Sequence, residues 1–170
     1  SLPTRATYPA LSAYVRDALD ICRAAAFDLI ILESAGTGQS DASILDYCDL
    51  SMYVMTPEYG AASQLEKINM LDYADLVVIN KSDKPGAADA LIEVRKQYKR
   101  NHGSWNAKDI ELPVYATTAS LFNDTGTQLL FNGLLQKLDQ RCGTRFSSEI
   151  RLPEIKTHTE KSIIPAARIR

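Results

Sequence analysis

Residues 77–83 read Val77-Val78-Ile79-Asn80-Lys81-Ser82-Asp83, an apolar run that ends in polar, turn-forming residues. A short apolar run of this kind is typical of a strand buried on both faces of a parallel sheet. A helical pattern follows it at 87–102, so a strand alternates with a helix. The sequence therefore predicts an α/β fold, in which ligands bind beyond the carboxyl ends of the strands.

The same alternation extends through most of the chain. Expected strands lie at 27–33, 50–56, 76–80 and 113–117, and expected helices at 10–26, 61–73, 87–102 and 128–140. Four strands with intervening helices predict a doubly wound parallel sheet. The periodicity is lost after residue 140, so residues 1–141 are expected to form the domain and 142–170 a linker or extended C-terminal arm.

Composition excludes several classes of protein. The 170 residues include 19 basic and 21 acidic side chains, a net charge of −2, with no basic stripe that would favour nucleic acid. No stretch reaches the about 18 apolar residues of a membrane span, and the start has no signal-peptide pattern. Three widely spaced cysteines, Cys22, Cys48 and Cys142, favour reduced thiols. We expect a cytoplasmic protein.

Asn80, Lys81 and Asp83 form the pattern Asn-Lys-x-Asp after an expected strand, which resembles the guanine-specificity motif of GTP-binding proteins. A carboxylate at Asp83 can accept the N1 and N2 protons of guanine, which adenine does not offer. The resemblance implies that Asn80 holds the loop and contacts the purine, and that the Lys81 stem covers its ring. Thr118 and Ala119 resemble the loop whose backbone N–H meets guanine O6. The alternative is a solvated turn, because these residue types are common after strands.

A second polar segment, Glu33-Ser34-Ala35-Gly36-Thr37-Gly38-Gln39, follows the expected strand at 27–33. It resembles the G-protein chaperones of cobalamin-dependent acyl-CoA mutases, as does the segment 53–67. The resemblance implies that Glu33 supports magnesium and that Gly36 and Gln39 belong to the catalytic γ-phosphate sensor. The implied switch residues are Gly38, Pro57, Glu58, Gln64 and Lys67.

The phosphate-binding pattern Gly-x-x-x-x-Gly-Lys-Ser/Thr does not occur, since none of the eight glycines precedes a lysine. We therefore expect a partial P-loop NTPase-type sheet that lacks the phosphate-loop strand, in a chain that begins partway through the GTPase domain. The segment 162–170 resembles the linker that joins this domain to the substrate-binding barrel of fused isobutyryl-CoA mutases.

The implied function is a GTP-binding domain that gates adenosylcobalamin loading or protection of an acyl-CoA mutase of the isobutyryl-CoA or methylmalonyl-CoA type. GTP or GDP with Mg²⁺ would bind here, and adenosylcobalamin would belong to the mutase domain or subunit. The alternative is a non-catalytic α/β interaction module that contacts a mutase without nucleotide turnover. Exposed sheet edges would also allow a homodimer.

We expect residues 1–170 alone not to hydrolyse GTP measurably, because the phosphate-binding loop is missing from them. Phosphate release from GTP and Mg²⁺ measures this. Turnover at the rate of the full-length protein would contradict the interpretation of the N-terminal region.

Overall fold

The computed structural model describes residues 14–34, 43–61, 65 and 68–146. Within these, the sheet has three strands, β1 (Met52–Met55), β2 (Leu76–Ile79) and β3 (Val114–Ala116), in the order β1-β2-β3. Both pairings are parallel, with Val77 opposite both Tyr53 and Val114. The α/β fold with a parallel sheet is confirmed.

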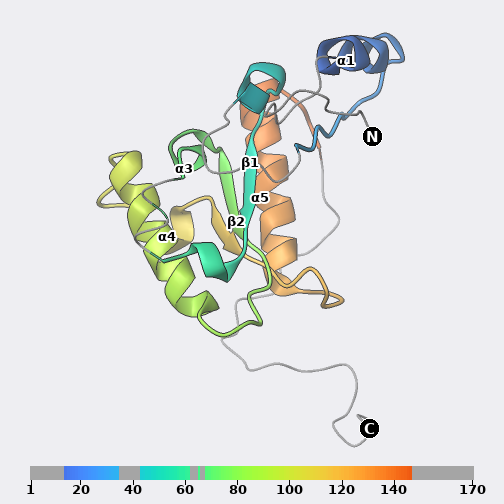
Figure 1. Cartoon of the computed structure of the whole chain (residues 1–170). Helices are drawn as coiled ribbons and strands as arrows, with labels where there is room; N and C mark the ends of the chain where they lie inside the picture. Colours follow the sequence, from blue (N-terminus) through green and yellow to red (C-terminus); the bar gives the residue numbers. More distant parts are fainter. Residues whose placement is uncertain (1–13, 35–42, 62–64, 66–67, 147–170) are drawn as a thin grey trace, which may run out of the picture.

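The described residues also form several helices. They are α1 (Val15–Ala24), α3 (Met70–Tyr73), α4 (Ala87–Asn101) and α5 (Thr125–Cys142), with 3-10 turns η1 (Ser43–Tyr47), η2 (Pro57–Tyr59) and η3 (Asp109–Glu111). Figure 1 shows α4 and α5 on opposite sides of the strands, as a doubly wound sheet requires. None of the described helices has the length and apolar character needed to cross a membrane.

The core is centred on β2, all four residues of which are buried. Leu71 of α3, Val94 of α4 and Val114 of β3 are equally inaccessible to solvent. They belong to the same hydrophobic cluster as Val77 and Ile79 of β2. A strand with neighbours on both edges and helices on both faces can expose no side chain, which explains its uninterrupted apolar sequence.

Helix α5 is longer at both ends than the periodicity predicts. Asp124 caps its first turn, since its carboxylate accepts a hydrogen bond from the Thr127 N–H at 2.7 Å. Gly143 ends it in the left-handed conformation, with φ +66°. The boundary expected at residues 141 and 142 stays a prediction, since residues 147–170 lie outside the described part.

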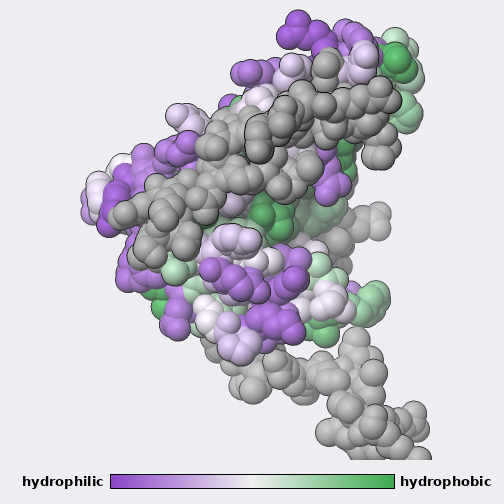
Figure 2. Space-filling view, viewed as in Figure 1, coloured by the Kyte–Doolittle hydropathy of each residue, from purple (hydrophilic) through white to green (hydrophobic). Residues whose placement is uncertain are grey.

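The strand expected at 27–33 is wrong. Residues 27–34 form no strand: Ile30 and Leu32 are half-buried against Val15 and Leu19 of α1, whereas the odd-numbered Phe27, Leu29 and Ile31 are exposed. A parallel strand needs a hydrogen-bonded neighbour, and this segment has none in the described residues, so only one of its faces is covered. Figure 2 shows apolar surface at the end of the molecule that carries α1 and this segment.

Two expected helices lie only partly within the described residues. The helix expected at 10–26 is described only from Val15 and ends at Ala24, before Ala26 takes a positive φ of 56°. Of the helix expected at 61–73, the structure shows α3 and a helical Leu65, whereas residues 62–64, 66 and 67 lie outside the described part.

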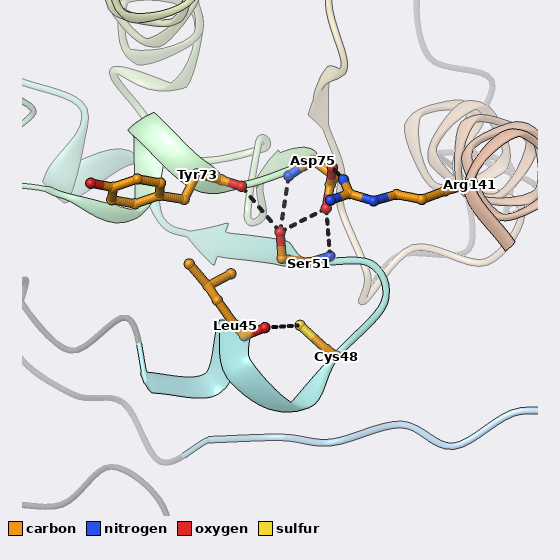
Figure 3. A network of polar contacts seen from close by, with 6 residues as sticks. All are labelled: Leu45, Cys48, Ser51, Tyr73, Asp75 and Arg141. Carbon is orange, nitrogen blue, oxygen red and sulfur yellow. Dashed lines mark hydrogen bonds and ion pairs between the residues drawn. The ribbon is translucent and has the colours of Figure 1, made fainter.

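A network of hydrogen bonds and an ion pair lies at the amino ends of β1 and β2 (Figure 3). The Asp75 carboxylate accepts hydrogen bonds from the N–H and the hydroxyl of Ser51, each at 2.9 Å, and its other oxygen pairs with Arg141. The Ser51 hydroxyl also accepts from the Asp75 N–H at 3.1 Å. One carboxylate therefore connects the starts of β1 and β2 with the end of α5.

Replacing Asp75 with alanine should lower the free energy of unfolding by about 1–3 kcal/mol, because the Ser51 groups and Arg141 lose their shared acceptor. Urea unfolding measures the change. The control is Lys96→Ala, which removes an exposed i,i+3 ion pair with Glu93 and should change stability by less than about 0.5 kcal/mol. Equal effects of the two substitutions would show that the Asp75 network contributes no more than a surface pair.

Candidate functional site

The carboxyl ends of β2 and β3 carry two loops, 80–86 and 117–124, that meet around a cavity of about 260 Å³. The cavity is lined by Asn80, Lys81, Asp83, Lys84, Ala119 and Ser120. Four of the five residues predicted to bind guanine are among them, and the fifth, Thr118, precedes Ala119. The structure therefore brings together two segments that are nearly forty residues apart in the chain.

Asn80 connects the two loops. Its side-chain oxygen accepts a hydrogen bond from the Ala119 N–H at 3.1 Å and from the Thr117 hydroxyl at 3.3 Å. The Ser82 N–H adds a backbone hydrogen bond to the Thr117 carbonyl at 2.9 Å. Asn80 thus holds the loop after β3 against the loop after β2, whereas its contact with a purine stays a prediction.

Lys81 makes the turn that opens the cavity. It has a φ of +59°, a left-handed conformation that costs an L-residue about 1–2 kcal/mol, and its carbonyl accepts a hydrogen bond from the Lys84 N–H at 3.0 Å. The resulting turn contains Asp83, whose carboxylate lies 3.8 Å from the Lys84 ammonium group. Both side chains are about half exposed, so solvent screens this pair and the Asp83 carboxylate remains accessible to a ligand.

Two residues at this site were missed by sequence reasoning. The Ser82 hydroxyl lies 2.9 Å from the Thr118 hydroxyl, and the Asp124 carboxylate accepts the Thr118 N–H at 3.0 Å. Ser82 occupies the unspecified position of the Asn-Lys-x-Asp pattern, so the pattern gave it no role. Asp124 carried a detectable signal, since an aspartate before an apolar helical run is typical of an N-cap.

The carboxyl end of β1 lies near the same loops. Pro57 and Glu58, two of the predicted switch residues, form η2 there. A hydrogen bond from the Thr56 side chain is the largest cause that lowers the pKa of Glu58, and the nearby Lys81 and Lys84 charges add to it. Gly60 is buried where a Cβ would come within 2.2 Å of the Ala90 Cβ, so the chain after η2 lies directly on α4.

The other predicted residues are not placed at this cavity. Gly36, Gly38, Gln39, Gln64 and Lys67 lie outside the described residues. Glu33 is exposed and belongs to the segment that packs on α1, at the opposite end of the sheet from the cavity (Figure 1). The part of the chain that the structure describes has no group of three or more His, Cys, Asp or Glu that could hold a metal ion. Magnesium binding by Glu33 stays a prediction.

A second cavity, of about 220 Å³, lies at the amino ends of the strands beside the Asp75 network. Cys48 is among its lining residues, and its thiol donates only a long contact of 4.0 Å to the Leu45 carbonyl (Figure 3). Burial raises the pKa of Cys48, and the negative charges of Asp75 and Asp49 raise it further. The group is therefore a protonated thiol at neutral pH and a poor nucleophile. All three cysteines are free, as the sequence predicted.

The structure is an α/β domain consistent with part of a P-loop NTPase-type fold, in which the loops after two neighbouring parallel strands form a cavity. Comparison with known families gives a match to the one described as "Methylmalonyl Co-A mutase-associated GTPase MeaB", over residues 1–139. The chain belongs to this GTPase family.

Known relatives agree with this assignment. The chain is 47% identical over 169 residues to a fused isobutyryl-CoA mutase of Geobacillus kaustophilus, and 47% identical over 171 residues to one of Cupriavidus metallidurans. These matches cover 99% and 100% of the chain, which spans about 15% of the length of either relative. A "Methylmalonic aciduria type A homolog, mitochondrial" of Caenorhabditis elegans is 31% identical over 58 residues, 34% of the chain and 14% of that relative.

Alkylation of Cys48 by iodoacetamide should become fast only at a higher pH than for an ordinary thiol, because a raised pKa delays formation of the thiolate. Mass spectrometry of the labelled peptides over a pH series measures this. Asp49→Asn removes one of the charges that raise the pKa, so it should shift the Cys48 profile toward lower pH and leave the exposed Cys142 unchanged. A Cys48 profile that follows free cysteine would contradict the assignment.

Proposed function

We propose that the cavity between the loops 80–86 and 117–124 binds the guanine base of GTP or GDP, with Asp83 as the residue that selects guanine. The supporting observation is that Asp83 lines a cavity that Asn80 and Ala119 also line. A carboxylate carries only acceptors, so it pairs with the N1 and N2 donors of guanine and with no equivalent pair in adenine.

The residues around Asp83 suit a purine in distinct ways. The aliphatic stem of Lys81 would cover one face of the ring, while its ammonium group stays in solvent. Asn80 would contact the base edge. Because the Ala119 N–H already donates to Asn80, the neighbouring Ser120 N–H would be the backbone donor to O6. Thr118 does not line the cavity; its hydroxyl bonds to Ser82, so it would act by holding the loop.

The remainder of the nucleotide site is proposed from the resemblance to this family. Glu33 would support Mg²⁺, and Gly36 and Gln39 would sense the γ-phosphate. Bound GTP would supply a phosphoanhydride whose hydrolysis would change the state of the switch residues, which are Gly38, Pro57, Glu58, Gln64 and Lys67. The position of Glu58 near Lys81 and Lys84 favours communication between that segment and the base-binding loop.

For the whole protein, we propose a GTPase that gates adenosylcobalamin loading or protection of an acyl-CoA mutase. Relatives that match the entire chain and are named fused isobutyryl-CoA mutase favour a mutase domain in the same polypeptide. A cytoplasmic location, dimerisation and independence of nucleic acid belong to the same proposal. The competing proposal, an interaction module without nucleotide turnover, predicts binding of neither GDP nor ADP.

In the natural full-length protein, Asp83→Asn should weaken GDP binding about ten- to a hundred-fold, because a charge-assisted pair of hydrogen bonds is lost. Xanthosine diphosphate should bind relatively better, since an amide can donate to its additional keto oxygen. Calorimetric titration with GDP, xanthosine diphosphate and ADP in the presence of Mg²⁺ measures both effects.

The matched control is Asp89→Asn, an exposed carboxylate in the first turn of α4 that does not line the cavity. It should leave the affinities unchanged. An unaltered preference for GDP in Asp83→Asn would reject the role of Asp83, and binding of neither GDP nor ADP by the unmodified protein would favour the interaction module.

A further inference from the structure

We propose that Asp124 is a positioning residue for nucleotide binding: it fixes the loop that forms one wall of the guanine cavity to the first turn of α5. This role rests on the proposed function, because it assigns Asp124 to the cavity formed by Asn80, Asp83 and Ala119. Asp124 itself does not line that cavity.

A single oxygen of the Asp124 carboxylate connects the loop with the helix. It accepts hydrogen bonds from the Thr127 N–H at 2.7 Å, the Thr127 hydroxyl at 2.8 Å and the Thr118 N–H at 3.0 Å. The first two cap the helix, as an ordinary N-cap residue does. The third reaches back six residues to the loop, which a cap alone does not require.

The hydroxyl and the carbonyl of Thr118 form hydrogen bonds in addition to that of its N–H. Its hydroxyl lies 2.9 Å from the Ser82 hydroxyl, and its carbonyl accepts the Leu121 N–H at 2.8 Å, which closes a tight turn. The two residues inside this turn, Ala119 and Ser120, are the ones that line the cavity. The N–H of Ala119 also bonds to Asn80. Fixing Thr118 therefore fixes the backbone atoms that would face the base.

The first turn of α5, to which Asp124 attaches the loop, packs closely against the sheet. A Cβ at Gly126 would lie 1.8 Å from the Ala116 carbonyl oxygen, so the first turn of α5 rests directly on the end of β3. A Cβ at Gly133 would come within 2.0 Å of the Tyr115 hydroxyl, so the middle of the helix is equally close to the strand. Because α5 cannot move away from β3 without losing these contacts, Asp124 holds the loop at a defined position relative to the strand.

Three variants of the natural full-length protein separate positioning from helix capping. Asp124→Ser keeps an N-cap acceptor, but its side chain is too short to reach the Thr118 N–H as well. Asp124→Asn keeps a carbonyl oxygen at the same distance from the backbone and can accept all three hydrogen bonds. The control is Asp139→Ser in the last turns of α5, where the carboxylate accepts from the Thr144 hydroxyl at 2.7 Å and the Phe146 N–H at 3.0 Å.

Two measurements are made on each variant. Hydrogen exchange without nucleotide should be faster at the amides of residues 118–120 in Asp124→Ser and unchanged in the other two. Stopped-flow release of a fluorescent GDP analogue should be about three- to ten-fold faster in Asp124→Ser, the effect of losing one hydrogen bond. Asp124→Asn should restore release to within about two-fold of the unmodified protein, and Asp139→Ser should leave it unchanged.

Faster exchange with unaltered GDP release would overturn the positioning role and leave Asp124 as a structural residue. Equal acceleration by Asp139→Ser would overturn it too, since loosening either end of α5 would then suffice. Should Asp124→Ser fail to fold, Ser82→Ala removes the other side-chain anchor of Thr118 and must accelerate release for the proposal to stand. If the unmodified protein binds no GDP analogue, the proposed function itself fails, which the exchange measurement distinguishes from failure of the Asp124 contact.

Discussion

The complete burial of β2 is the constraint on which the rest of the structure depends. The strand has neighbouring strands on both edges and helices over both faces, so a polar side chain along it would be buried without water. Polar side chains can therefore occur only where the strand begins, at Asp75, and where it ends, at Asn80. Asp75 forms a network that connects β1, β2 and α5. Asn80 begins a loop that lines a solvent-accessible cavity.

These two ends differ in how their polar groups are satisfied. At the amino end, the Asp75 carboxylate is mostly buried and its partners all belong to the domain, which makes the contact structural. At the carboxyl end, Asp83 is half exposed and, among the described residues, pairs weakly with Lys84, while Asn80 uses its oxygen to hold the neighbouring loop. The arrangement stabilises the walls of the cavity and leaves the Asp83 carboxylate accessible from solvent.

The strand-helix alternation and the Asn-Lys-x-Asp turn were predictable because both depend on local patterns: an apolar run, a helical period and turn-forming residues. The strand expected at 27–33 was not, because an apolar run forms a strand only where a neighbour is present to receive its hydrogen bonds. Residues such as Ser82 and Asp124 act through contacts with Thr118, and no pattern within either segment records such a contact. Sequence thus located the candidate cavity but not the residues that support its wall.

Helix α5 is fastened at both ends, by Asp124 to the loop after β3 and by Arg141 to Asp75 at the far end of the sheet. The helical rise places these two attachments about 26 Å apart along the axis. Insertion of a single residue between them would turn one end by about 100° relative to the other, so that both attachments could not form together. The helix can therefore tolerate many changes of side chain on its outer surface, but its length is fixed by the positions of its two partners, the loop after β3 and Asp75.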